Sequence, residues 1–141
     1  MNLTVIKNAD ISIVKKEMGR MFHEGSIDID VRHLAETAIR SGRTAIGDIF
    51  DFVRFTFPYQ SDPLTAELFI HPRLMARSYF NGMPRKGDCD DFALLTASML
   101  QSVGYESRLA IIARGFEYDH VVAQVNTSLG WINVDTSDKK L

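Results

Sequence analysis

The stretch that decides the fold is "RKGDCDDFALLTASML", residues 85–100, which contains the only cysteine of the chain, Cys89. This cysteine lies between a glycine turn and an apolar segment, with aspartates on both sides. The apolar residues that recur at three- and four-residue steps are Phe92, Leu95, Met99 and Val103. Their spacing predicts a helix that begins at Cys89, and Gly104 is a natural place for it to end.

Length and composition indicate one soluble globular domain, residues 1–141, because 45% of the residues are hydrophobic and 24% are charged. A net charge of −2 argues against nucleic-acid binding, since no basic excess exists to neutralise phosphates. No apolar run approaches the ~20 residues that a membrane helix needs, and residues 1–20 lack a signal-peptide core. One cysteine excludes an intrachain disulfide and fits a reducing compartment. We therefore expect a cytoplasmic protein with no membrane partner.

Helical patterns occupy most of residues 1–57, with predicted helices at 10–24, 31–42 and 44–57. The residues expected to begin these helices are Asp10, Asp30 and either Thr44 or Gly47. Residues 58–88 are rich in breakers and are expected to be mainly loop, with a short helix at 73–80.

The pattern changes to short runs of Val and Ile after Gly104. These runs, at residues 107–114, 119–126 and 131–136, are separated by turn signals and predict an antiparallel meander. Helices followed by strands in one small chain indicate an α+β fold, with the cysteine helix packed on the small sheet.

A lone thiol at a helix start is suited to nucleophilic chemistry. The thiolate is the attacking form, and an unperturbed thiol has a pKa of about 8.5. A helix N-terminus favours an anion, and an imidazole can accept the thiol proton. The carboxylates of Asp88, Asp90 and Asp91 would oppose thiolate formation, so we interpret them as residues that stabilise the helix start, with Asp88 as its cap.

His120 is the histidine whose position suits such a base, because it leads a predicted strand. The next strand ends at Asp135, and antiparallel pairing across residues 126–130 brings the two residues to the same end of the hairpin. A carboxylate there would orient the imidazole. The other histidines, for which we expect surface or boundary positions, are His23, His33 and His71.

Three segments together resemble the transglutaminase-like superfamily, whose core is papain-like: "GDCDDFALLTASMLQSVGYESR", "DHVVAQV" and "GWINVDTS". The shared features are the Gly-Asp-Cys helix start, Gly104 and Arg108 before and in the first strand, the histidine that leads a strand, and the segment from Trp131 to Asp135. The resemblance covers residues 82–137. Upstream, "VRFTFPYQSDP" is similar to a helix and turn of bacterial and phage members.

The resemblance implies Cys89 as nucleophile, His120 as general acid/base and Asp135 as the orienting carboxylate, with no cofactor and no metal. The reaction would be acyl transfer from an amide or ester of a peptide, protein or other substrate, through a thioester acyl-enzyme. Water as acceptor makes a peptidase or amidase, which we favour, and an amine makes a transglutaminase. The Cys89 N–H would bind the oxyanion. Asn81 is a candidate second donor by residue type alone.

Two alternatives stay open at this point. A catalytically inactive interaction or assembly module would keep the fold and most of the motif. A metal-dependent hydrolase would instead use the aspartates around Cys89 together with His120.

Overall fold

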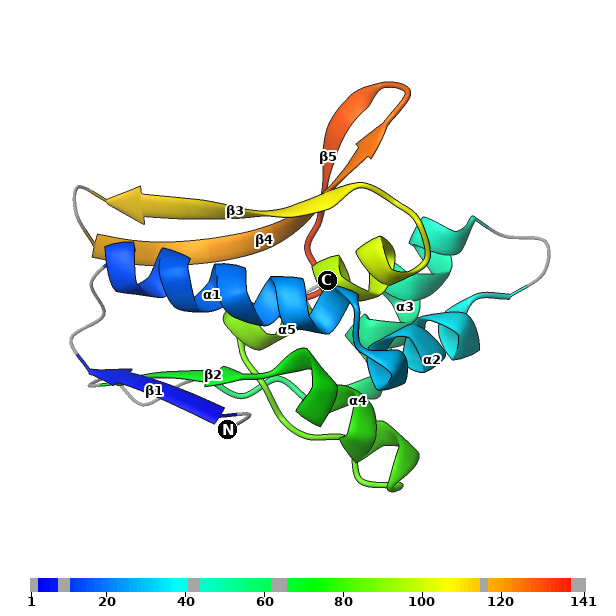
Figure 1. Cartoon of the computed structure of the whole chain (residues 1–141), viewed down its shortest axis with the longest axis horizontal. Helices are drawn as coiled ribbons and strands as arrows, with labels where there is room; N and C mark the ends of the chain where they lie inside the picture. Colours follow the sequence, from blue (N-terminus) through cyan, green and yellow to red (C-terminus); the bar gives the residue numbers. More distant parts are fainter. Residues whose placement is uncertain (1–2, 8–10, 41–43, 62–65, 115–116, 138–141) are drawn as a thin grey trace.

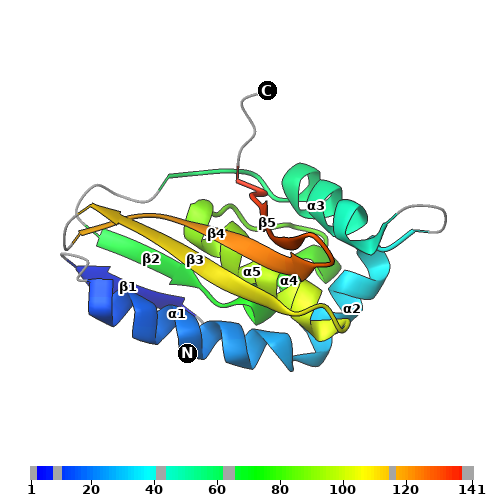
Figure 2. The same cartoon turned by 90° about the horizontal axis from the view of Figure 1, so that it is seen from above.

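The computed structural model describes residues 3–7, 11–40, 44–61, 66–114 and 117–137. In chain order they form β1 (Leu3–Lys7), α1 (Ile11–Ser26), α2 (Ile29–Ala38), α3 (Ala45–Thr56), β2 (Ala66–Ile70), α4 (Pro72–Phe80), α5 (Cys89–Ser102), β3 (Ser107–Arg114), β4 (Glu117–Thr127) and β5 (Gly130–Val134). Figure 1 shows α1 and α5 between a three-stranded sheet and the β1–β2 pair. The view from above places α5 beneath the sheet (Figure 2). The predicted α+β architecture is confirmed.

The three-stranded sheet is the predicted antiparallel meander, with strand order β3-β4-β5. Ile111 pairs with Val121 and Ala123 pairs with Val134, so the middle strand is β4. Gly130 at the β4–β5 turn has φ near +100°, a conformation that glycine adopts without steric cost. This turn fixes the register of the two strands that carry His120 and Asp135.

Helix α5 is the centre of the core. Every side chain from Asp90 to Leu100 is buried, although a surface helix would expose one face. The helix packs against α1, α2, α3 and α4, and also against β3 and β4. Its burial explains why residues 92–100 carry small or apolar side chains on all sides, and it makes the start of α5 a fixed point in the molecule.

The helix caps differ in part from the sequence predictions. Thr44 caps α3, as predicted, by accepting a hydrogen bond from the Gly47 N–H. Helix α2 is capped by Asp28 instead of Asp30, because the Asp28 carboxylate accepts from the N–H groups of Asp30 and Val31. The predicted cap Asp10 lies outside the described residues.

The paired strands β1 and β2 were not predicted. Strand β1 precedes the first predicted helix and β2 lies in the segment expected to be loop, and Leu3 pairs with Ile70 across most of the N-terminal half of the chain. Such a pairing leaves no local turn signal in the sequence. Helix α4, predicted at residues 73–80, is confirmed and follows β2 directly.

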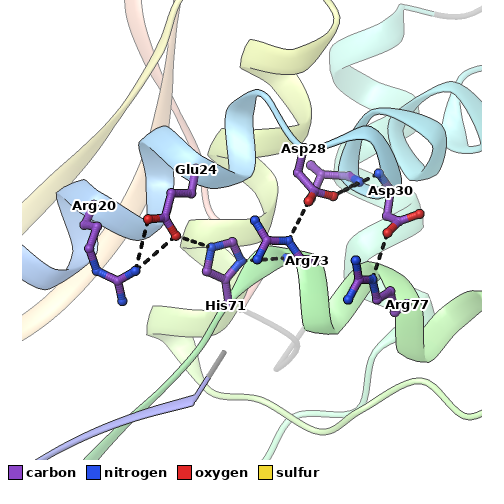
Figure 3. A network of polar contacts seen from close by, with 8 residues as sticks. Arg20, Glu24, Asp28, Asp30, His71, Arg73 and Arg77 are labelled. Atoms are coloured by element: carbon purple, nitrogen blue, oxygen red, sulfur yellow. Dashed lines mark hydrogen bonds and ion pairs between the residues drawn. The ribbon is translucent and has the colours of Figure 1, made fainter. Parts of the chain in front are cut away.

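His71 is the cap of α4 and is fully buried, where the sequence predicted a surface or boundary position. Its Nδ1 accepts a hydrogen bond from the Arg73 N–H at 3.0 Å, and its Nε2 contacts Glu24 Oε1 on α1 at 3.0 Å. Arg20 binds the same Glu24 carboxylate (Figure 3). The histidine therefore joins α4 to α1, which is a structural role.

Two further ion pairs join α2 to α4 (Figure 3). Arg73 Nε lies 2.6 Å from Asp28 Oδ2, and Arg77 Nε lies 2.8 Å from Asp30 Oδ2. Because Asp28 also caps α2, the first of these pairs couples a helix start to a neighbouring helix.

In the part of the chain that the structure describes, no helix combines the length and apolar character needed to cross a membrane.

The buried imidazole of His71 predicts a pH-dependent stability. Burial lowers its pKa below 6.5, with the charges of Arg73 and Arg20 acting in the same direction and Glu24 opposing them. As the pH falls below about 6.5, the unfolded chain binds a proton that the folded protein does not, so the free energy of unfolding decreases. The stability is present above this pH and is lost as the pH falls toward the lower pKa.

Chemical denaturation between about pH 5 and pH 7 would measure this slope. We expect His71→Asn to remove much of it, because asparagine keeps a capping acceptor but does not titrate. His23→Asn, at an exposed position on α1, should leave the slope unchanged. Equal slopes in the wild type and His71→Asn would contradict this account. The pKa of Glu24 is lowered, chiefly by its hydrogen bond with His71, so it titrates below this window.

Candidate active site

A capping box defines the start of α5. The Asp88 carboxylate accepts a hydrogen bond from the Asp90 N–H at 3.1 Å and also bonds the Asp91 backbone. In return, Asp91 Oδ2 accepts from the Asp88 N–H at 3.1 Å. This reciprocal arrangement satisfies N–H groups that would otherwise lack acceptors at a helix start. The expectation that Asp88 caps the helix is therefore confirmed.

The buried Asp91 carboxylate also holds a second segment. Its Oδ1 accepts a hydrogen bond from the Ile70 N–H, at the end of β2, at 2.7 Å. Gly87 passes so close that a Cβ atom there would lie 2.9 Å from Asp91 Cβ. The turn before Cys89 is thus pressed against Asp91, and only glycine fits without displacing it.

Cys89 is the first residue of α5 and is partly buried. Its Sγ lies 3.8 Å from Asp90 Oδ1, and the residue packs against an apolar cluster that includes Leu94 and Val121. Val121 directly follows His120 on β4, so the cysteine packs in the cluster that contains the residue next to the histidine in sequence. Asp88, Cys89 and Asp90 each offer one potential metal-ligand atom, and these atoms lie within 4.8 Å of one another. This group of residues could therefore hold a metal ion.

The His120 imidazole and the Asp135 carboxylate are in contact. His120 Nε2 lies 3.3 Å from Asp135 Oδ2, and about a third of each side chain is exposed. Asp135 Oδ1 accepts hydrogen bonds from Ser137, at 3.1 Å from its N–H and 2.6 Å from its hydroxyl. The carboxylate is therefore held in place on one side and faces the imidazole on the other, while the pair stays accessible to solvent.

The pair is anchored to α5 by the residues that follow each member. Val121 is fully buried, and the Thr136 Oγ1 lies 2.9 Å from Thr96 Oγ1 on α5. A register shift between Ile112 and Ala113 lies opposite the start of β4, next to His120. Such a bulge bends a strand and redirects the neighbouring side chains. The part of β4 that pairs with β5 is residues 123–127. His120 comes before this part, so it lies outside the β4–β5 pairing.

The structure thus brings His120 and Asp135 together, as the sequence predicts. Contact between the Cys89 thiol and the His120 ring stays a prediction, as do the catalytic roles of all three residues. Of the other histidines, His23 is exposed and His33 stacks on Phe80 with ring centroids 4.5 Å apart.

Two other residues that the sequence singled out lie elsewhere. Asn81 ends α4 and borders a depression beside Asp30 and His33, so it belongs to the α2–α4 side of the molecule. The Arg108 guanidinium lies over the Trp131 ring, with its Cζ atom 3.9 Å from the ring centroid. This is a cation–π contact across the sheet.

Tyr59 is a residue of this region that sequence reasoning missed. Its backbone forms a parallel bridge with Gly87, and its ring meets Phe92 edge to face, with centroids 6.0 Å apart. It stands in the segment "PYQSDP", where the proline and aspartate indicate a turn but give no sign of contact with α5. The only available signal was its place in the upstream part of the family resemblance.

Comparison with known proteins identifies the family of the chain. The family model for the transglutaminase-like superfamily matches residues 32–136, from α2 to the residue after Asp135. The chain therefore belongs to the transglutaminase-like superfamily. No curated protein and no solved structure is significantly similar to it.

Replacement of two glycines should have opposite effects on stability. Gly87→Ala places a Cβ against Asp91 and should lower the free energy of unfolding by about 1–3 kcal/mol. Gly19→Ala, at an open position within α1, should raise it by about 0.5–1 kcal/mol. Urea denaturation followed by circular dichroism measures both. A Gly87→Ala protein as stable as the wild type would show that the turn is not held against Asp91.

Removal of the Asp91 carboxylate should be more damaging. Asp91→Ala leaves two buried N–H groups, those of Asp88 and Ile70, without an acceptor, which should cost about 2–5 kcal/mol. Asp91→Asn keeps one side-chain oxygen and should cost less. Glu36→Ala, which removes an exposed pair with Arg32, serves as the control and should change stability little. A loss for Asp91→Ala no larger than the control would refute the role of this carboxylate.

Proposed function

We propose that the chain is a cysteine-dependent acyl-transfer enzyme that cleaves an amide or ester bond, most often by hydrolysis. Cys89 is the nucleophile, His120 the general acid/base and Asp135 the carboxylate that orients the imidazole. The observation that carries the proposal is the His120–Asp135 contact, at the end of the hairpin that packs on the cysteine helix. Membership of the superfamily supports the reaction class.

The chemistry follows from the hydrogen bonding of the imidazole. When His120 donates its Nε2–H to Asp135, Nδ1 carries the lone pair and can accept the thiol proton. The Cys89 thiolate then attacks the carbonyl carbon, and the carbonyl oxygen becomes an oxyanion near the Cys89 N–H. Collapse of this intermediate leaves a thioester, and the leaving group takes the proton from the imidazolium.

Water completes the reaction in the hydrolytic form. His120 accepts a proton from the water as it attacks the thioester, and the Cys89 thiolate leaves. We favour water over an amine because the His120 and Asp135 side chains are about one third exposed, so water reaches the intermediate without a second binding site. The partner we propose is a peptide, protein or other amide substrate. A cytoplasmic setting would keep the thiol reduced.

Alkylation by iodoacetamide near pH 7, followed by mass spectrometry of Cys89, tests the proposal. We expect the wild-type thiol to react faster than free cysteine, because the imidazole and the helix start favour the thiolate. His120→Ala should reduce the rate to that of free cysteine or below, and Asp135→Asn should give a smaller loss. His33→Ala, on the exposed side of α2, is the matched control and should react like the wild type.

The alkylation rates and an activity assay with a chelator separate the rival functions. An interaction or assembly module predicts a slow thiol whose rate does not depend on His120. A metal-dependent enzyme predicts that a chelator abolishes activity while Cys89→Ala retains it. Either result would contradict the proposed function.

A further inference from the structure

We propose that Tyr59 is a catalytic residue, whose hydroxyl donates a hydrogen bond to the acyl oxygen of a substrate bound at Cys89. This donor would act beside the backbone N–H of Cys89, so that two groups stabilise the oxyanion of the tetrahedral intermediate. The inference rests on the proposed function, because it assigns a role in that reaction.

The backbone around Tyr59 is fixed next to the turn that leads into Cys89. The Gly87 N–H donates to the Pro58 carbonyl at 3.1 Å, and the Gln60 N–H donates to the Gly87 carbonyl at 2.8 Å. The hydrogen bonds are made by the residues directly before and after Tyr59, and they place its Cα opposite Gly87. Gly87 lies two residues before Cys89.

The ring of Tyr59 extends from this point along the start of α5. It meets the ring of Phe92 at an interplanar angle of 70°, and Phe92 lies about one helical turn after Cys89. The tyrosine is therefore bounded by residues on both sides of the cysteine. Phe92 is fully buried, whereas Tyr59 is 45% exposed, so one part of its ring is anchored in the core and another part is accessible to a ligand.

The electrostatic surroundings keep the Tyr59 hydroxyl protonated. Burial raises its pKa above 10.0, and the negative charges of Cys89, Asp88 and Asp90 raise it further, while a hydrogen bond with Ser61 lowers it. The charges that act on the phenol belong to groups at the start of α5. A phenol that stays neutral remains a hydrogen-bond donor throughout the pH range in which a thiolate attacks.

The capping box at the start of α5 engages the N–H groups of Asp88, Asp90 and Asp91, so a second donor for an oxyanion at Cys89 has to come from another segment. An oxyanion is stabilised best by preorganised donors that converge on it, commonly two. Asn81, the candidate by residue type, lies on the α2–α4 side. Among the residues that the structure describes, Tyr59 is a side-chain donor whose backbone is held beside the cysteine turn and whose ring contacts α5.

A pair of reagents that act on the same thiol tests the assignment. In the reaction with p-nitrophenyl acetate, the thiolate attacks the ester carbonyl, passes through an oxyanion, and forms an S-acetyl thioester with release of p-nitrophenolate. In the reaction with iodoacetamide, the thiolate displaces iodide from carbon, and no oxyanion forms. The ratio of the two rates therefore isolates oxyanion stabilisation from thiol ionisation.

We expect Tyr59→Phe to slow acetylation of Cys89 by about 10²–10³-fold, the usual effect of losing one oxyanion donor, with its iodoacetamide rate unchanged. Phenylalanine keeps the ring contact with Phe92, so the denaturation midpoint should also be retained. Tyr79→Phe is the matched control, because Tyr79 packs on Phe52 in another part of the core and should leave both rates unchanged.

The possible outcomes separate the two proposals. Equal acetylation of the wild type and Tyr59→Phe would overturn the role of the hydroxyl, as would an equal fall of both rates, which would indicate an effect on the thiol alone. A wild-type Cys89 that is inert to both reagents would overturn the proposed function, and the inference with it.

Discussion

The Asp91 carboxylate is the interaction on which the site depends. One of its oxygens completes the capping box with the Asp88 N–H, and the other binds the Ile70 N–H at the end of β2. A buried carboxylate is costly unless it is well hydrogen-bonded, and two N–H donors offset that cost here. Because Gly87 is packed against the same side chain, the turn, the strand and the helix start are fixed relative to one another, and Cys89 is positioned with them.

The hairpin supplies the other half of the site by an independent route. The turn at Gly130 sets the β4–β5 register, and Val121 and Thr136 attach the two strands to α5. His120 and Asp135 precede these anchors by one residue each, so burial of apolar and hydroxyl side chains determines where an imidazole and a carboxylate meet. The imidazole and the carboxylate themselves remain partly exposed. This division lets a small core hold these two side chains in place without burying them.

Sequence reasoning recovered the parts that local patterns encode. Asp88 and Thr44 have the chemistry and spacing of caps, and alternating Val-rich runs separated by a glycine turn predict the hairpin that joins His120 to Asp135. It missed what depends on distant contacts. The β1–β2 pair joins segments far apart in the chain, His71 becomes a buried cap only when α1 packs on α4, and the bulge beside His120 has no residue signal. Tyr59 is adjacent to the cysteine only through its bridge to Gly87.

The central claim is that the Cys89 thiol and the His120 imidazole act as one unit, and nitrogen-15 NMR of the histidine rings tests it most directly. In a protein with labelled histidines, we expect Cys89→Ser to change the ring nitrogen shifts of His120 at a fixed pH. The ring shifts of His23 and His33, which lie on α1 and α2, should stay the same. His120 ring shifts that are identical in the wild type and Cys89→Ser would refute a link between the thiol and the imidazole.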